Sequence, residues 1–419
     1  MDRVFEVAAG IDVHRDTVVV SVRRQREKRV EDVETRTFET FQDGLVAMTV
    51  WLEQQSVEVV GLESTGVYWQ PVVQAIQKRL PKVVVWLVNP MHVKKVAGRK
   101  SDVSDSQWLS KLVMYGLVSP SFVPSLHLQE LRKLTRHRTK LTADRTRVKN
   151  RILKELERSG LKLATVCSDV LGKTGRTLLE AMLAGMVLDD ATIQKMAYGS
   201  LRHRVQDLSR ALKDPITPCT AIILRQMLRR LDDINKDIAD LESEIRKLLQ
   251  PMADDIARLD QIPGIDEIAA AAIVAETGTD MSVFPSAKHL ASWGGLSPGS
   301  EESAGKAKQA PTRKGNKYLR TTLVQAAMAA KNTKGSFWQH KGRRLARLGP
   351  KKAAVALARS LASVVFHVLR DRCDYRDPAT IPPPPAVARA RLISLADQIR
   401  RLGFDVTITP RADQVPSVS

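Results

Sequence analysis

Residues 4–22 read VFEVAAGIDVHRDTVVVSV, and this stretch decides the fold expected for the first part of the chain. Two runs rich in β-branched residues flank the polar step His14-Arg15-Asp16, which is typical of two strands joined by a short turn. A third run, at residues 34–41, alternates in the manner of a strand. The chain is therefore predicted to open with three consecutive strands, the first of which ends at Asp12.

Alternating helices and strands are predicted to follow this opening. Ser101 is a candidate N-cap for a last helix that runs from Asp102 to about Tyr115. This order is that of an RNase H-like domain, although other α/β folds share parts of it. In such a sheet the first and fourth strands are neighbours, and the last helix packs across their ends. The intervening segments are helices at 44–54 and 68–80 and strands at 57–62 and 83–88.

Four carboxylates are expected to meet at the ends of these elements. Asp12 ends the first strand, Glu63 ends the fourth, and Asp102 and Asp105 lie three residues apart on one face of the last helix. Their mutual repulsion favours hard divalent cations, and two Mg²⁺ (or Mn²⁺) ions would hold the attacking and leaving oxygens of a phosphodiester. Helix capping and the helix dipole alone can explain acidic residues at the start of a helix, such as Asp102 and Asp105. They do not explain why Asp12 and Glu63 each end an apolar strand.

Positive charge is concentrated in two segments of a chain whose formal net charge is +20. Residues 125–162 hold 12 basic and 4 acidic residues, and residues 301–352 hold 14 basic and 2 acidic residues. Clustered charge of this size indicates a nucleic-acid partner, bound through its phosphates. The candidate contacts are Arg99, Lys100, Arg136, Arg138, Arg145, Lys306, Lys308, Arg313, Lys314, Lys317 and Arg320.

Other compartments and chemistries are disfavoured by the composition. No apolar run looks long enough to cross a bilayer, and the basic stretches are not flanked by aromatic, lipid-facing helices, so no membrane partner is expected. Three scattered cysteines form no CxxC pair, which argues against a disulfide framework or a zinc site. The expected location is therefore a reducing cytoplasm.

Two long helices are expected between the first and last domains. Apolar residues in 3-4 spacing run from Leu224 to Leu248, which is typical of a coiled coil that mediates self-association, although one helix of a globular bundle gives the same pattern. The segment at 259–269, with its Pro263-Gly264 turn, resembles a helix-hairpin-helix. The predicted domains are residues 1–124, a basic helical and coiled-coil region at 125–250, a mostly helical domain at 251–372, and a Pro-rich linker and tail at 373–419.

A serine-rich segment of the third domain has the composition of a phosphate-attacking loop. Ser297, Ser300 and Ser303 lie among glycines and next to many cations, which permit close approach to a phosphate and offset its developing charge. Composition alone does not rank these three serines.

A set of short motifs in fixed order resembles the DEDD transposases of bacterial insertion sequences, which are relatives of the pilin-gene inverting recombinase. The resemblance covers roughly residues 8–370. The motifs are Gly10-Ile-Asp-Val-His14, Glu63-Ser-Thr-Gly66, Val88-Asn-Pro90, Lys100-Ser-Asp-Val-Ser-Asp105, Ile262-Pro-Gly-Ile265, Gly295-Leu-Ser-Pro298, Glu302-Ser-Ala-Gly-Lys306 and Arg313-Lys-Gly-Asn316.

This resemblance implies an RNase H/RuvC-like domain that uses Asp12, Glu63, Asp102 and Asp105, a coiled-coil connector, and a C-terminal transposase domain whose catalytic serine is Ser303. It also implies recombination guided by a non-coding bridge RNA that pairs with double-stranded donor and target DNA. The expected assembly is a homo-oligomer, a dimer or a tetramer in the synaptic complex, and the expected location is the bacterial cytoplasm, in association with the nucleoid. One branch of the family has Ser-Gly where this chain has Ser303-Ala-Gly, so the loop is one residue longer here.

Three functions remain to be separated. The preferred one is a DNA recombinase in which Ser303 attacks the scissile phosphate with the help of Mg²⁺ on the four carboxylates. The second is a metal-dependent, junction-resolving nuclease in which water attacks and Ser303 is structural. The third is a nucleic-acid-binding protein without catalytic activity.

Overall fold

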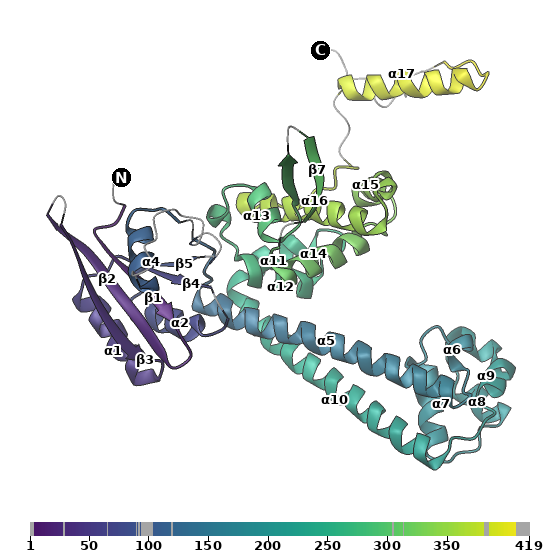
Figure 1. Ribbon diagram of the computed structural model, residues 1–419. Coiled ribbons are helices and arrows are strands. Elements are labelled where there is room, and N and C mark those ends of the chain that lie inside the picture. The colour runs from purple at the N-terminus through teal and green to yellow at the C-terminus, as the bar shows by residue number, and fades with distance from the viewer. Residues whose placement is uncertain are drawn as a thin grey trace.

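The structure of the chain is a computed structural model. It has an α/β domain at the N-terminus, a long pair of helices that ends in a small helical lobe, and a mostly helical C-terminal domain (Figure 1). The mixed α/β opening and the mostly helical remainder agree with the predicted fold class. The structure describes residues 4–27, 30–64, 66–88, 90, 93, 104–118, 120–303, 306–312, 314–380 and 385–407.

The N-terminal domain is built on a five-stranded sheet in the order β3-β2-β1-β4-β5. β1 pairs with β2 in antiparallel fashion and with β4 in parallel fashion, as expected of neighbouring first and fourth strands in an RNase H-like sheet. The strands are β1 (Val7–Val13), β2 (Thr17–Glu27), β3 (Val30–Glu39), β4 (Val59–Glu63) and β5 (Val84–Val88), and the helices are α1 (Gln42–Gln54), α2 (Trp69–Arg79) and α4 (Asp105–Met114).

Each face of this sheet is covered by different helices, because alternate residues of a strand point to opposite sides. Ala9 and Ile11 of β1 pack in one core with side chains of α1 and α2, whereas Ala8 packs in a second core with side chains of α4. Gly10 and Asp12 therefore belong to the α4 face. The same alternation assigns Glu63 to that face, since Val60 and Leu62 of β4 point the other way.

Two long helices, α5 (Leu126–Arg158) and α10 (Pro218–Leu249), run side by side in opposite directions (Figure 1). Each begins at a capping hydroxyl: Ser125 accepts a hydrogen bond from the Leu128 amide, and Thr217 accepts one from the Thr220 amide. The lobe at their far end consists of α6 (Leu163–Val166), α7 (Lys173–Leu183), α8 (Asp190–Met196), η1 (Gly199–His203) and α9 (Val205–Ala211).

The apolar seam of α10 is buried inside a single chain. Leu224, Leu231, Ile234 and Ile238 share a core with Val148 and Ile152 of α5, while Ile245 joins the core of the C-terminal domain. The expectation that this seam mediates self-association is therefore wrong. A 3-4 pattern specifies an apolar stripe, but it does not say whether the partner helix comes from the same chain.

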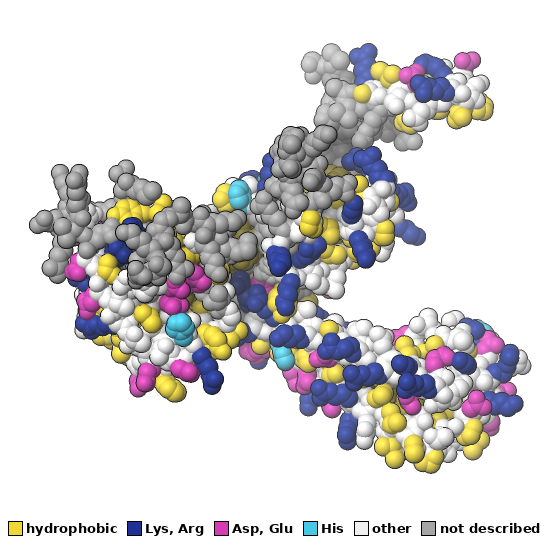
Figure 2. All heavy atoms as spheres, viewed as in Figure 1, with side chains coloured by type: hydrophobic (Ala, Val, Ile, Leu, Met, Phe, Trp, Pro, Cys, Tyr) yellow, Lys and Arg dark blue, Asp and Glu magenta, His cyan; other side chains and the backbone are white. Residues whose placement is uncertain are grey.

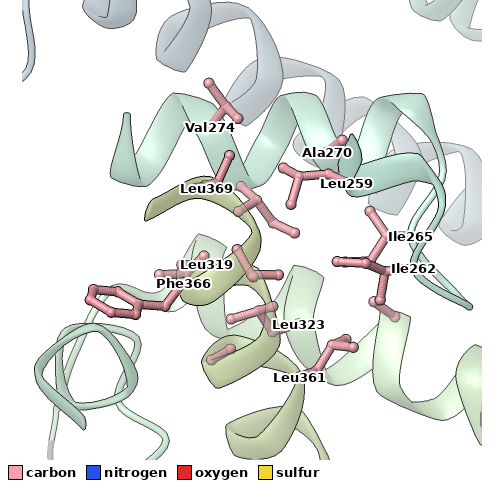
Figure 3. Close-up of a cluster of buried hydrophobic side chains, with 14 of the residues drawn as sticks. Leu259, Ile262, Ile265, Ala270, Val274, Leu319, Leu323, Leu361, Phe366 and Leu369 are labelled. Atoms are coloured by element: carbon pink, nitrogen blue, oxygen red, sulfur yellow. The ribbon is translucent and has the colours of Figure 1, made fainter. Parts of the chain in front are cut away.

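The C-terminal domain packs its helices around α16 (Figure 3). Leu361, Phe366 and Leu369 of α16 meet Leu259, Val274 and Leu319 from the surrounding helices. The helices are η2 (Gln250–Met252), α11 (Ala253–Asp260), α12 (Glu267–Thr277), η3 (Met281–Val283), α13 (Ala287–Trp293), α14 (Lys317–Ala330), α15 (Phe337–Leu345), η4 (Ala346–Leu348) and α16 (Pro350–Asp371).

One apolar helix departs from the sequence-based expectation. Among the described residues, α16 is long and apolar enough to cross a membrane by length and composition. It is the central helix of the domain core, because its apolar residues from Leu357 to Leu369 are buried against neighbouring helices. Its composition therefore reflects burial within protein.

Three further segments differ from, or refine, the predictions. The Pro263-Gly264 turn joins α11 to α12, and Gly264, whose φ is +85°, presses against the backbone of α14, so the turn packs within the domain. The serine segment forms a hairpin of β6 (Pro298–Ser303) and β7 (Lys306–Thr312) rather than a loop. The predicted tail contains a helix, α17 (Pro385–Arg401), which stands apart from the domain in Figure 1.

Candidate active site

The first half of the candidate site lies where β1 and β4 end side by side. Gly10 pairs with Gly61, and Ile11 pairs with Leu62, so Asp12 and Glu63 occupy corresponding positions one residue further along each strand. Both belong to the face of the sheet that α4 covers. Two carboxylates predicted from strand ends are thus brought to adjacent positions by the parallel register.

The two glycines allow α4 to lie directly on the sheet. A Cβ atom on Gly10 would come within 2.0 Å of the Ser106 carbonyl oxygen and 2.3 Å of the Ser110 amide nitrogen. A Cβ atom on Gly61 would come within 2.3 Å of the Val113 Cγ2 atom. The absence of side chains here is the physical reason that a helix can reach the strand ends that carry Asp12 and Glu63.

Polar contacts fix α4 at this level of the sheet. Ser21 Oγ of β2 lies 2.8 Å from Ser106 Oγ, and the buried Arg23 donates through Nε to Ser110 Oγ at 3.2 Å. The helix begins at Asp105 with Ser104 as its N-cap, in place of the Ser101 cap expected from the sequence. Asp105 therefore stands at the first turn, immediately before the residues that contact Gly10.

Asp102 lies outside the described residues, as do Arg99 and Lys100. Among the side chains that the structure does describe, no group of three or more His, Cys, Asp or Glu residues forms a metal-binding cluster. Asp12, Glu63 and Asp105 carry carboxylate oxygens, which are the donors that Mg²⁺ and Mn²⁺ prefer.

One partner of Asp12 received no role in the sequence analysis. His14 Nε2 lies 3.1 Å from Asp12 Oδ2, and the two side chains are 59% and 31% exposed. Alternation along β1 places residues 12 and 14 on the same side, so the spacing in Gly10-Ile-Asp-Val-His14 contained the signal.

The second half of the candidate site is the β6–β7 hairpin. Ser303 is the last residue of β6 and pairs with Lys306, while Glu301 pairs with Lys308. Only Ala304 and Gly305 separate the paired residues, so Ser303 occupies the end of the hairpin. Ser300 pairs with Gln309 near the middle, and Ser297 precedes the strand. The structure therefore separates the three serines: Ser303 is at the end of the hairpin, Ser300 is within it, and Ser297 comes before it.

The root of the hairpin is held by a close crossing of its two ends. The Asn316 amide donates to the Trp293 carbonyl oxygen at 2.8 Å. A Cβ atom on Gly315 would come within 2.4 Å of the Gly295 amide nitrogen. Gly295 itself has a φ of +64°, a conformation that favours glycine. Glycines on both sides of the crossing are therefore needed for the hairpin to leave the domain at this point.

A buried ion-pair network ties this root to α5. Glu276 of α12 is 1% exposed and accepts two hydrogen bonds from Arg136, at 2.7 and 2.8 Å. The Asn316 side chain donates to Glu276 Oε2 at 2.6 Å, and Arg132 Nε lies 3.2 Å from the same oxygen. Burial lowers the pKa of Arg132, although Glu276 opposes this effect. The signal for Glu276 in the sequence is a lone acid that ends the apolar run of 268–275.

The same helix also contacts the N-terminal domain. Gln129, one turn before Arg132, is 8% exposed. Its side chain donates to Gln77 Oε1 of α2 at 2.8 Å and accepts from Gln74 Nε2 at 3.0 Å. Successive turns of α5 therefore bind first the carboxylate domain and then the root of the serine hairpin.

The predicted nucleic-acid contacts fall into distinct environments. Arg136 and Arg138 are engaged within the protein, since Arg138 Nε donates to Glu242 Oε1 at 2.7 Å. Arg145 is half-buried, Lys314 and Lys317 are exposed, and Arg320 lines a cleft beside the hairpin. Lys306 and Lys308 are placed by the backbone of β7, and Arg313 lies outside the described residues.

Two family models match the chain. A model described as a transposase matches residues 9–160, which include Asp12, Glu63 and Asp105, and a model described as the transposase IS116/IS110/IS902 family matches residues 256–341, which include Ser303. Both halves of the candidate site thus lie in matched segments.

Curated relatives match over parts of their length. A Sinorhizobium fredii protein described as a transposase (y4pF/y4sB) is 32% identical over 33% of this chain and 37% of its own. The insertion element IS110 uncharacterized 43.6 kDa protein of Streptomyces coelicolor is 31% identical over 38% and 40% of the two chains. The insertion element IS900 uncharacterized 42 kDa protein of Mycobacterium paratuberculosis is 27% identical over 60% and 66%. The matched segments therefore span less than two thirds of these relatives.

Among solved structures, RuvC of Thermus thermophilus aligns with 27% of this chain and 99% of its own, at 17% identity and a TM-score of 0.21. The two family models together match more than half of the chain. From these matches we conclude that the chain belongs to the IS116/IS110/IS902 family of transposases.

Proposed function

We propose that this protein is the transposase of an insertion sequence and that it cuts and rejoins DNA strands with a site assembled from two parts. Asp12, Glu63, Asp102 and Asp105 form one part, and Ser303 forms the other. The observation that supports the proposal most directly is the pairing of Gly10 with Gly61 beneath α4, because it gives Asp12 and Glu63 neighbouring positions on the strands that the helix beginning at Asp105 covers. Carboxylates at the ends of neighbouring strands are able to hold the divalent cations that assist phosphoryl transfer.

The proposed reaction is a pair of phosphoryl transfers at Ser303. The Ser303 Oγ atom attacks the scissile phosphorus, a bond forms between Oγ and phosphorus, and the DNA hydroxyl on the other side of the phosphate leaves with a proton. A hydroxyl from a second DNA end then attacks the same phosphorus, and Ser303 leaves with its proton restored. Each step exchanges one phosphate ester for another, so no high-energy cofactor is consumed.

The four carboxylates would hold Mg²⁺ or Mn²⁺, which supplies positive charge to the phosphate oxygens and lowers the pKa of an attacking hydroxyl. The hydrogen bonds of Ser106 and Ser110 with β2 support this arrangement, because they hold α4, which begins at Asp105, on the sheet. The crossing of Gly295 with Gly315 and the Glu276 network orient the hairpin that bears Ser303. Lys306, the pairing partner of Ser303, is available to offset phosphate charge.

The proposed partners are double-stranded donor and target DNA and a non-coding guide RNA. The charge of α5 supports a polyanionic partner, because Lys140, Arg151 and Lys154 are exposed along its surface. We also retain the proposal that the protein works as a dimer or tetramer in the bacterial cytoplasm. The surface for that assembly is not the α10 seam, which α5 covers.

Metal-dependent strand cleavage tests the carboxylate part of this proposal. Full-length protein is incubated with DNA that carries the element ends, the guide RNA and Mg²⁺, and strand breaks are counted with and without chelator. Asp12→Asn, Glu63→Gln and Asp105→Asn should each remove most cleavage, while thermal unfolding stays close to wild type. Asp16→Asn is a matched control, because Asp16 lies beyond the same strand and is 82% exposed. Cleavage that persists in chelator or in Asp12→Asn would contradict the proposal.

A further inference from the structure

A cleft of about 890 Å³ opens at the root of the serine hairpin. Its walls come from both ends of the hairpin, at Pro298 and Thr312, and from α14, α15 and α16. The cleft is therefore next to the element that carries Ser303, yet none of the proposed catalytic side chains lines it.

The ionisable side chains in the described lining of the cleft are all basic. Arg320, Lys341, Lys351, Lys352 and Arg359 line it, and among the described lining residues there is no Asp or Glu. Figure 2 shows Lys and Arg side chains gathered over the part of the molecule that α15 and α16 occupy. Arg320, Lys341 and Arg359 are half-buried, so their positive charges are partly removed from water, and no carboxylate is among the lining residues that the structure describes. Such a cluster repels itself, and an anion in the cleft relieves this repulsion.

Lys341 is the lining cation whose withdrawal from water has the clearest electrostatic effect. Its burial, and secondarily the charge of Arg344, lowers the pKa of its ammonium group. The lysine is held over the Phe337 ring, with Nζ 5.2 Å from the ring centroid. Lys341 is therefore a partly desolvated cation that lies against Phe337.

The floor of the cleft is apolar. Leu296, Leu345, Leu348, Val355 and Ala356 contribute to it. A ligand that satisfies both parts of the lining has phosphate groups for the cations and a flat apolar portion for the aliphatic floor. Free phosphate lacks the apolar portion, and a base-paired duplex presents its backbone while keeping the faces of its bases stacked inside.

We propose that this cleft binds a single-stranded segment of DNA, with its phosphates on Arg320, Lys341 and Arg359 and at least one unpaired base against the aliphatic floor. The choice of DNA rests on the proposed function, because the cleft adjoins the hairpin on which Ser303 would receive a DNA strand. The segment bound here is the strand that continues from the scissile phosphate. Opening of the duplex next to the cut site is then a feature of binding, before any bond is broken.

Binding is measured by fluorescence anisotropy on the full-length protein, with a labelled 12-nucleotide single strand and chelator present so that no cleavage occurs. Lys341→Gln/Arg359→Gln should weaken binding by about tenfold or more at low salt. In a plot of log affinity against log salt concentration, the magnitude of the slope should also fall by about 1.4, because two phosphate contacts to a single strand are lost. Arg229→Gln/Arg230→Gln is the matched control, since it removes two exposed cations of α10 and should leave both quantities nearly unchanged.

Three other probes identify the occupant. An abasic strand of the same length should bind more weakly than the normal strand, because it has nothing to place on the floor. The duplex of the same sequence should depend less on Lys341 and Arg359 than the single strand does. The proposal would be wrong if Lys341→Gln/Arg359→Gln weakened duplex and single-strand binding equally and the abasic strand bound as well as the normal strand. The cleft would then be a surface that contacts the backbone of duplex DNA. An RNA strand that depends on the two cations more strongly than DNA would assign the cleft to the guide.

Lysine acylation locates the bound strand. Because its pKa is lowered, Lys341 should react faster than its partial burial alone would suggest, and the 12-nucleotide strand should protect it in a peptide map. Lys236 of α10, which is exposed, should react equally with and without DNA. Unchanged acylation of Lys341 under saturating DNA would overturn the proposal. If DNA protects Lys341 but a suicide substrate with Mg²⁺ gives no adduct at Ser303, the cleft proposal stands and the serine chemistry is wrong. If the adduct forms but DNA does not protect Lys341, the serine chemistry stands and only the cleft proposal is wrong.

Discussion

Gly10 of β1 pairs in parallel register with Gly61 of β4, and both lie beneath α4 without room for a side chain. The two contacts differ in kind. At Gly10 the neighbouring atoms belong to the backbone of α4, at 2.0 and 2.3 Å from an added Cβ atom, whereas at Gly61 the neighbour is the end of the Val113 side chain. The backbone atoms near Gly10 can make room for a Cβ atom only if α4 moves as a whole. The Val113 side chain near Gly61 can instead be shortened by substitution.

This difference predicts that Gly10→Ala is more damaging than Gly61→Ala. Gly61→Ala should cost about 1–3 kcal/mol of stability, which is the usual effect of overpacking. The second substitution Val113→Ala should relieve part of that cost, and no equivalent partner exists for Gly10→Ala. The measurement is thermal unfolding of the four proteins that make up the Gly61/Val113 double-mutant cycle, together with Gly10→Ala. Additive effects of Gly61→Ala and Val113→Ala would show that the contact is not the cause.

Glu276→Gln should destabilise the protein by about 3–5 kcal/mol, because it leaves Arg132 and Arg136 partly buried without their carboxylate. Glu267→Gln is the matched control on the same helix, since Glu267 forms an exposed pair with Arg246 and its loss should change unfolding very little. Chemical denaturation monitored by circular dichroism measures both. Equal, small effects of the two substitutions would mean that the buried network contributes no stability. Charge reversal of Arg136 should destabilise the fold for the same reason, so it does not report on nucleic-acid binding by itself.

Ile238→Ala should lower stability by about 2–5 kcal/mol and leave the molecular mass in solution unchanged, because Ile238 is 4% exposed in a core shared with α5. Ile222→Ala, on the same helix but 54% exposed, should change stability by less than about 0.5 kcal/mol. Thermal unfolding and analytical ultracentrifugation measure the two properties separately. A shift to smaller species in Ile238→Ala, with normal stability, would restore the seam as an interface between copies.

Lys341 should make stability depend on pH. Its pKa is lowered from an ordinary value of 10.5, so the unfolded chain binds more protons than the folded chain between the lowered pKa and 10.5. The free energy of unfolding contributed by this group therefore rises with pH across that window. Lys341→Gln should remove this rise and be at least as stable as wild type at neutral pH. Lys236→Gln serves as the exposed control, and identical pH profiles for Lys341→Gln and wild type would contradict the assignment.

The N-terminal domain was predictable because its signals are local. β-branched runs, polar turns and Asp12 or Glu63 at strand ends give the element order, and the RNase H-like order then gives the neighbouring strands. The helix start was misplaced at Ser101, because Ser101 and Ser104 are equally good caps in sequence and only packing of Ser106 against Gly10 fixes the register.

The partners of long-range contacts were not predictable in this way. Nothing near Arg136 indicates that its carboxylate is Glu276, 140 residues further along the chain. The cations of the cleft are also far apart in the sequence, since Arg320 comes from α14 and Arg359 from α16. The hairpin at 298–312 was missed because its strands, PGSEES and KAKQAPT, contain no Val, Ile or aromatic residue, and their pairing depends on the glycine crossing at the root.

The central claim is that Ser303 is the nucleophile, and the identity of a protein–DNA adduct tests it most directly. Wild-type protein is trapped on a suicide DNA substrate with Mg²⁺ and guide RNA, denatured, digested and mapped by mass spectrometry. The phosphodiester is expected on the peptide that contains Ser303, and Ser303→Ala should bind the same DNA without forming an adduct. Ser300→Ala is the matched control on the same strand and should form the adduct normally. Efficient cleavage by Ser303→Ala, with no adduct in wild type, would contradict the account and assign the attack to water.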